Sequence, residues 1–275
     1  MEKKKLRVFL IVWIALIAAI LAAIFLVGLP RGHTESVKVM MKDAVLHGEN
    51  RISLFGLNVN PALISSYIVT AVLLLAALII RIFAIPRFKD VPGKFQTVIE
   101  MLVEFFADMA KSNSPHRTGF VAAYIFGAGV YVFFGTLFEL FGLQAVTTHG
   151  TSITLPAPLA DINGAIAMGF LSFGVIWATG FIAGGPKGGL KVLKDFSLPI
   201  SMSFRLFGAL LSGLLVTELV YYYVSLSFVL PVLVGVLFTI MHALIQTYVL
   251  TTLVSVFYGE AAEPPKKKEK KDKIK

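Results

Sequence analysis

Seven residues in mostly apolar surroundings have side chains that could hold or pass an ion. They are Arg205, Glu218, His242, Gln246, Asp161, Asn163 and Glu139. Arg205 lies in SMSFRLFGALLSG, a stretch that otherwise has the composition of a membrane-buried helix. A charge at that depth is costly, so such residues usually face a protein interior or a water-filled cavity and serve an ion path. The alternative is that Arg205 extends to the nearby membrane surface, because its helix begins only a turn or two earlier.

Three of the polar residues follow Arg205 on the two segments that end the chain. Glu218 is thirteen residues further on, about 20 Å along a helix, so it is not a direct salt-bridge partner of the arginine. His242 and Gln246 are four residues apart and share one face of the last helix. A lone histidine in an apolar helix is often only packed core. Polar residues on consecutive antiparallel helices nevertheless favour a shared path.

The remaining candidates lie near the ends of two other apolar segments. Asp161 and Asn163 occur in PLADIN, where a helix begins, and both residue types are favoured as helix caps. Their position alone makes capping the expected role. Glu139, near the end of the preceding segment, fits either an interfacial or a functional position.

The elements that must position these residues are membrane helices. The chain has 275 residues, of which 57% are hydrophobic and 15% charged, and its mean hydropathy is +0.82. This composition is typical of a polytopic membrane protein. The absence of cysteine excludes disulfides and thiol chemistry. The net charge of +9 comes from short loops and termini, as in oriented membrane helices, which argues against nucleic acid as a partner.

Six apolar stretches reach the roughly twenty residues that a membrane-spanning helix needs. They cover 6–29, 61–85, 119–141, 162–184, 198–228 and 230–258. In 94–111, by contrast, charged residues recur at helical spacing and predict an amphipathic helix along the membrane surface. We therefore predict an all-α polytopic membrane protein with one membrane domain, 1–262, and a basic disordered tail, 263–275.

Basic residues predict which side of the membrane each loop occupies. They precede the first span and recur in RIFAIPRFK, in GGPKGGLKVLKDF and in the tail, all inside if the chain crosses six times. Both termini are then cytoplasmic. No phosphate-binding loop, HExxH or nucleophile elbow occurs, so we expect no catalytic residue, metal or cofactor.

Four separated motifs resemble one protein family. SMSFRLFGALLSG resembles the signature S-L-R-L-F-G-N-M-x-A-G-E of subunit a of F-type ATP synthases. VPGKFQT, PLADIN and LIQTYVLTTLVSVFYG resemble three further family segments, in the same order, and extend the match over nearly the whole chain beyond residue 52. The first span, 6–29, is additional to the commonest members.

The resemblance implies a stator subunit beside a rotating ring of c subunits in a bacterial plasma membrane. Its other partners would be the peripheral stalk, contacted by the in-plane helix, and the rest of the ATP synthase. Two offset half-channels would each cross part of the bilayer, with Arg205 between them on a hairpin of the last two helices against the c-ring. Gln246 matches a family glutamine, and Asp161, Asn163 and Glu139 match polar positions toward the outer half-channel. Proton and sodium both remain possible ions.

The chain departs from the family pattern at three positions. Ala209 replaces an asparagine, Leu214 a glutamate, and Thr239 a histidine or glutamate. Glu218 and His242 lie one turn away from the last two of these positions, which predicts an outer relay that has moved along its helices. The alternatives are an independent secondary transporter, although no internal repeat is seen, and a membrane-embedded enzyme, which would need a catalytic constellation.

Overall fold

The computed structural model describes residue 15, residues 51–222 except 55, 149 and 151, and residues 230–263. The side chains of 214, 217, 218, 220–222 and 230–234 also lie outside the described part. The predicted span 6–29, apart from Ala15, and the predicted tail beyond Glu263 therefore fall outside the described residues.

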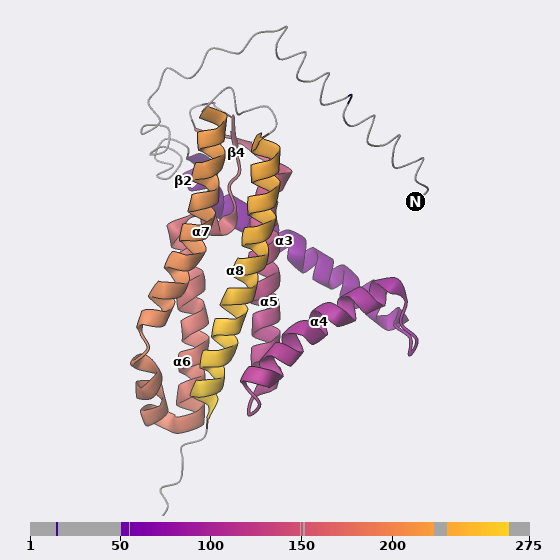
Figure 1. Cartoon of the computed structure of the whole chain (residues 1–275), viewed down its shortest axis with the longest axis vertical. Helices are drawn as coiled ribbons and strands as arrows, with labels where there is room; N and C mark the ends of the chain where they lie inside the picture. The colour runs from indigo at the N-terminus through magenta and orange to yellow at the C-terminus, as the bar shows by residue number, and fades with distance from the viewer. Residues whose placement is uncertain are drawn as a thin grey trace, which may run out of the picture.

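Helices make up most of the described chain (Figure 1). The long ones are α3 (Pro61–Ile79), α4 (Lys94–Asn113), α5 (Thr118–Leu137), α6 (Ile162–Leu193), α7 (Ser197–Tyr222) and α8 (Leu230–Ala262). Short helical turns are η1 (Ile80–Ala84), η2 (Ile85–Arg87), η3 (Phe138–Phe141) and η4 (Pro158–Ala160). Among the described residues, four helices are long and apolar enough to cross a membrane: Pro61–Arg87, Thr118–Phe141, Ile162–Leu193 and Gly235–Ala262. The predicted class, an all-α membrane protein, is confirmed.

Helices α5, α6, α7 and α8 form an elongated bundle. Helix α8 packs against each of the other three. In Figure 1, α7 and α8 lie side by side, with α7 in front of α6 and α8 in front of α5. Glycines permit the closest approaches: a Cβ added to Gly169 of α6 would lie 2.7 Å from the carbonyl oxygen of Pro199 in α7. Side chains buried between the helices include Ile125, Val132, Ile176, Leu206, Leu210 and Val254.

Helices α3 and α4 form an arm that leaves this bundle and returns to it (Figure 1). The helix predicted over 94–111 is α4, and it lies across the bundle rather than along it. Gln96 fastens the turn before α4, because its Oε1 accepts a hydrogen bond from Lys89 N at 3.0 Å and its Nε2 donates to Lys89 O at 2.9 Å. Phe106 and Ala110 are the buried residues of α4.

Two short β-hairpins cover one end of the bundle, within connections predicted only as loops. They pair β1 (Ile52–Leu54) with β2 (Leu57–Val59) and β3 (Gln144–Val146) with β4 (Ser152–Thr154). Thr148 N donates to Arg51 O at 2.9 Å and so joins one hairpin to the other. Ile52 and Leu155 pack with Val69 of α3 and Phe138 beside α5. The hairpins thus tie the beginning of α3 to the bundle.

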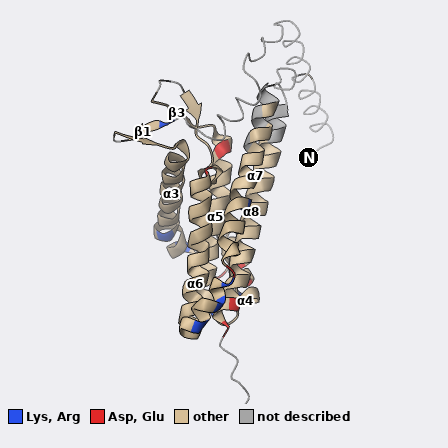
Figure 2. Ribbon diagram, turned by 90° about the vertical axis from the view of Figure 1, so that its left-hand side faces the viewer, with Lys and Arg blue, Asp and Glu red and all other residues tan. Residues whose placement is uncertain are grey.

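The opposite end of the bundle, here called the basic end, carries Lys187, Lys191 and Lys194, and Figure 2 shows acidic side chains near it as well. Helix α6 breaks there at Gly185, which has φ 61° and is followed by Pro186. Proline suits the first turn of a helix, so the chain resumes helical structure and folds back on itself. Trp177 Nε1 donates to Gly189 O at 3.2 Å across this fold. The stretch predicted as a loop after 184 is therefore helical through Leu193.

Candidate functional site

Arg205 lies on the exposed side of α7, about 12 Å of helix from where α7 begins. Four neighbours at helical spacings are also exposed on α7: Ser201, Phe204, Gly208 and Ser212. Within the described part of the chain, no carboxylate forms an ion pair with Arg205. Because an unpaired charge in a membrane is costly, this position suits an acidic partner on another chain.

The neighbouring helix extends this exposed face. Leu237, Met241, Leu244 and Tyr248 of α8 are all exposed and recur at spacings of three or four residues. The two helices lie side by side (Figure 1), so together they present an apolar surface that carries the guanidinium of Arg205.

Glu139 and His242 meet at a small cavity near the hairpin end of the bundle, where α5, α7 and α8 converge. Its lining consists of Thr136, Glu139, Leu210, Gly213, Phe238, Thr239 and His242. The volume is about 10 Å³, close to the roughly 10–15 Å³ that one water molecule requires. A carboxyl group, an imidazole and two hydroxyls therefore surround a space of about one water molecule.

Packing around His242 keeps the imidazole at this cavity. The ring of Phe238 lies edge-on to it, with centroids 5.8 Å apart. A Cβ added to Gly213 would lie 3.4 Å from His242 Nδ1, so the glycine leaves room for the imidazole. Thr136 donates its hydroxyl proton to Val132 O at 2.8 Å, which leaves its oxygen as an acceptor.

The polar residues are ordered along the bundle. Gln246 is one turn from His242, about 6 Å toward the basic end, and its side chain is 5% exposed. Arg205 precedes Gly213 by eight residues, about 12 Å in the same direction. From the hairpin end downward the order is therefore the cavity, Gln246 and then Arg205.

The other candidates lie apart from this cavity. The side chain of Asp161 caps α6, accepting from Asn163 N at 3.3 Å and from Asn163 Nδ2 at 3.4 Å. Neither residue lines the cavity. Glu218 lies in α7 five residues beyond Gly213, about 7.5 Å further toward the hairpin end, and its side chain is outside the described part.

Thr136 is a cavity residue that the sequence did not single out. It precedes Glu139 by three residues, a spacing that puts both on one side of the chain and could have been noticed. Thr239, noted only as a replacement, also lines the cavity. The sequence alone does not show that Thr136 and Glu139 lie at the same cavity as Thr239 and His242, about a hundred residues later.

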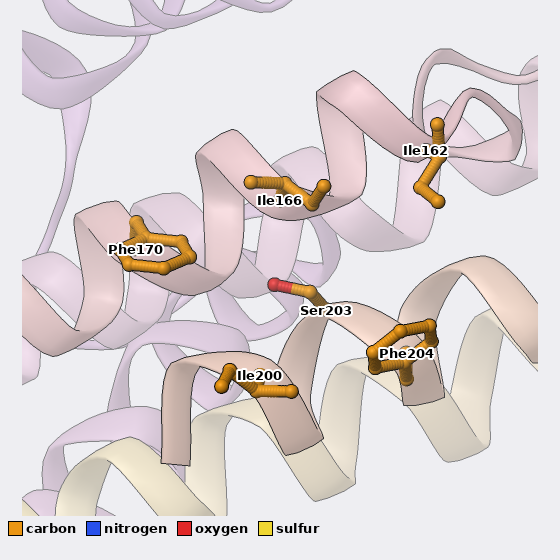
Figure 3. Close-up of a pocket in the computed structure, with 6 residues that line it drawn as sticks. All are labelled: Ile162, Ile166, Phe170, Ile200, Ser203 and Phe204. Carbon is orange, nitrogen blue, oxygen red and sulfur yellow. The ribbon is translucent and has the colours of Figure 1, made fainter. Parts of the chain in front are cut away.

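A second hollow, between α6 and α7, is apolar (Figure 3). It has a volume of about 110 Å³ and is lined by Ile162, Ile166, Phe170, Ile200, Ser203 and Phe204. Its one hydroxyl, that of Ser203, already donates to Pro199 O at 2.6 Å. This hollow therefore offers no polar route past Arg205.

The fold and the polar residues define a multi-pass membrane protein with ionisable groups within its helices. In the described residues no group of His, Asp or Glu is arranged to hold a metal ion. The family model of the ATP synthase A chain matches residues 64–259, so the chain belongs to that family.

Curated relatives agree with the family match. The ATP synthase subunit a proteins of Cereibacter sphaeroides strains ATCC 17025 and ATCC 17029 are each 28% identical over 210 residues. Each alignment covers 72% of this chain and 80% of the relative. The predicted family is confirmed, and with the apolar helices it supports a bacterial multi-pass membrane protein of ATP synthesis and ion transport. Members of this family are channel components of the complex and not its catalytic subunits.

Proposed function

We propose that this chain provides the ion path beside a rotating c-ring, with Arg205 facing the ring between two offset half-channels. The observation that carries the proposal is the position of Arg205, exposed on α7 and about 12 Å inside the helix. The c-ring and the peripheral stalk are the partners, and the membrane is the bacterial plasma membrane with both termini cytoplasmic.

The chemistry follows from the cost of charge in a membrane. A ring carboxyl group that faces lipid must be neutral, because an ion there is strongly disfavoured. Beside Arg205 the same group can ionise, since the guanidinium compensates its charge. Arginine does not give up its own proton at working pH, so it prevents direct proton transfer between the half-channels. Each ion that crosses the field supplies about 2.3 kcal/mol per 100 mV.

The outer half-channel runs through the cavity between α5, α7 and α8. Glu139 and His242 line it, Gln246 lies between it and Arg205, and Glu218 is placed toward its entrance. Water can bridge gaps that a direct hydrogen bond cannot, so a relay moved by one helical turn still conducts. Asp161 and Asn163, at the beginning of α6, contribute polar groups near the same end.

Arg205→Ala tests the proposal in inverted membrane vesicles. We expect ATP-driven ion pumping, followed by fluorescence quenching, to be lost while the assembled complex remains at its normal amount on an immunoblot. Arg205→Lys should also fail or nearly fail, because an ammonium lacks the planar fork and can lose its proton when buried. Varying Na⁺ in the same assay distinguishes proton from sodium transport.

Arg81→Ala is the matched control. Like Arg205, Arg81 is an exposed arginine in an apolar helical stretch, but it lies in η1 on the arm formed by α3 and α4, away from α7. The Arg81→Ala variant should pump normally. Near-normal pumping by either Arg205 variant would contradict the proposal. Pumping by the isolated chain without a ring would instead favour an independent transporter.

A further inference from the structure

A long groove lies between α5 and α6 on the basic half of the bundle. Both helices pack against α8, and the groove between them has a volume of about 670 Å³. Residues that line it include Arg117, Gly119, Phe120, Gly174, Ala178 and Tyr258. The proposed ion path does not use any of them.

The dimensions of the groove match one leaflet of a bilayer. Along α6 it extends from Phe170 to Ile182, twelve residues or about 18 Å. That length exceeds half of the roughly 30 Å hydrocarbon thickness. Gly119 and Gly174 deepen it, because no atom lies within 4 Å of a Cβ added at either position. The hydrogen bond of 2.9 Å between the Tyr124 and Ser172 hydroxyls joins the two helices behind it.

One end of the groove is suited to an anion. Arg117 lines that end, and no ion pair involves its guanidinium among the described residues. Arg117 is also the N-cap residue of α5 and makes no side-chain capping hydrogen bond, so the first N–H groups of α5 have no partner from it. Such groups attract negative charge.

Tyr258 adds an independent polar group. Its side chain is only 3% exposed and its ring stacks on Phe120, with centroids 6.5 Å apart. Within the described part of the chain its hydroxyl has no hydrogen-bond partner, although it lines the groove. The hydroxyl oxygen itself is not enclosed by the protein, so it opens onto the groove, where a bound molecule can supply its partner.

We propose that this groove binds an anionic phospholipid, with one acyl chain between α5 and α6 and the phosphate beside Arg117. A transmembrane helix of another subunit is the competing occupant, and the labelling test below distinguishes it from a lipid. The guanidinium of Arg117, which lines one end of the groove, supplies the charge complementarity to the phosphate.

The test uses the complete ATP synthase in phosphatidylcholine vesicles. These vesicles contain traces of a phospholipid with a photoreactive acyl chain, carrying either a phosphatidylglycerol or a phosphatidylcholine headgroup. Adducts on residues 170–182 are then counted by mass spectrometry. We expect the phosphatidylglycerol probe to label this segment about fivefold more than the neutral probe, because one basic residue attracts an anionic headgroup by about that factor.

Three variants separate the two parts of the site. Arg117→Gln should lower phosphatidylglycerol labelling to the level of the neutral probe. Gly174→Leu should reduce labelling by both probes because it fills the groove. Gly127→Leu is the matched control on α5. An added Cβ at Gly127 also meets no atom within 4 Å, but Gly127 does not line the groove. This control should leave labelling unchanged.

Equal labelling by the two probes in the unmodified complex would overturn the proposal, since it indicates ordinary boundary lipid. So would labelling that Arg117→Gln leaves unchanged. Absence of adducts from either probe would mean that another subunit covers the groove.

Discussion

The helix pairs α7–α8 and α3–α4 both present apolar surface, but the bundle holds them very differently. Helices α7 and α8 contribute many side chains to the core and pack against α6 and α5. The buried residues of α3 all lie in its first half: Pro61, Ala62, Ser65 and Val69. Helix α4 buries only Phe106 and Ala110, both in its second half. The far end of the arm therefore touches little of the part of the chain that the structure describes.

This difference indicates what each pair can do. A side chain on α7 or α8 is held at a defined height by its own chain, which a stator site beside a moving ring requires. Among the described residues, the outer halves of α3 and α4 have few packing partners, so contacts beyond the described bundle must position them. Substitutions that detach the arm should therefore reduce assembly, whereas substitutions on the exposed or cavity-lining side of α7 and α8 should reduce transport in an assembled complex.

Phe106→Lys should have the largest effect on assembly. Phe106 is 3% exposed and its ring lies edge-on to Phe126 at 5.7 Å, so a lysine would place an unpaired charge among buried apolar groups. We expect at least about a tenfold lower yield of assembled complex on native gels. The control Phe105→Lys, on the adjacent but 49% exposed side chain, should lower the yield far less, as should Glu104→Gln. Equal yields for these variants would mean that Phe106 does not anchor the arm.

Gly129→Ala should have a smaller effect at the same contact. The new Cβ would lie 2.7 Å from Phe106 Cε1 and 3.1 Å from Thr251 Cγ2, with the ring enclosed between helices. Overpacking of this kind costs about 1–3 kcal/mol, so the purified complex should denature at a lower temperature. Gly127→Ala, two residues away with no atom within 4 Å of its Cβ, should be neutral or slightly stabilising. A lower denaturation temperature for both variants would point to helix α5 itself rather than to the arm contact.

His242→Ala should have the smallest effect, a loss of a few-fold in ATP-driven transport with normal assembly, because water can replace a neutral imidazole. Adding Thr239→His should recover part of the lost rate, since both side chains line the same cavity. The measurement is the initial pumping rate in inverted vesicles, normalised to assembled complex.

Glu218→Leu in the same assay tests the acidic member of the moved relay. It should slow transport more than His242→Ala does, and adding Leu214→Glu should restore a good part of the rate. A wild-type rate for Glu218→Leu would leave Glu139, with Asp161 and Asn163, as the acidic and polar groups of the path.

Several features of the fold could be predicted because each depends on residues close together in the chain. The charge spacing in 94–111 defines α4, since amphipathicity is a property of one helix. The long apolar segments define membrane helices for the same reason. The hairpins could not be predicted, because strands of three residues are too short for an alternating pattern to be recognised. The fold-back at Gly185 was missed because glycine and proline indicate a break but not the direction that follows it.

The sequence by itself determined that this is a polytopic membrane protein of the ATP synthase A chain family, and it singled out Arg205, because these depend on composition and local motifs. Only the tertiary structure decided that Glu139 and His242 share one cavity, that Phe106 rather than Phe105 anchors the arm, and that α5 and α6 leave a groove ending at Arg117. The physical reason is that the rotation of each helix and its choice of neighbours arise from packing between segments far apart in the chain. A rotation of about 100°, the step from one residue to the next, exchanges a buried side chain for an exposed one.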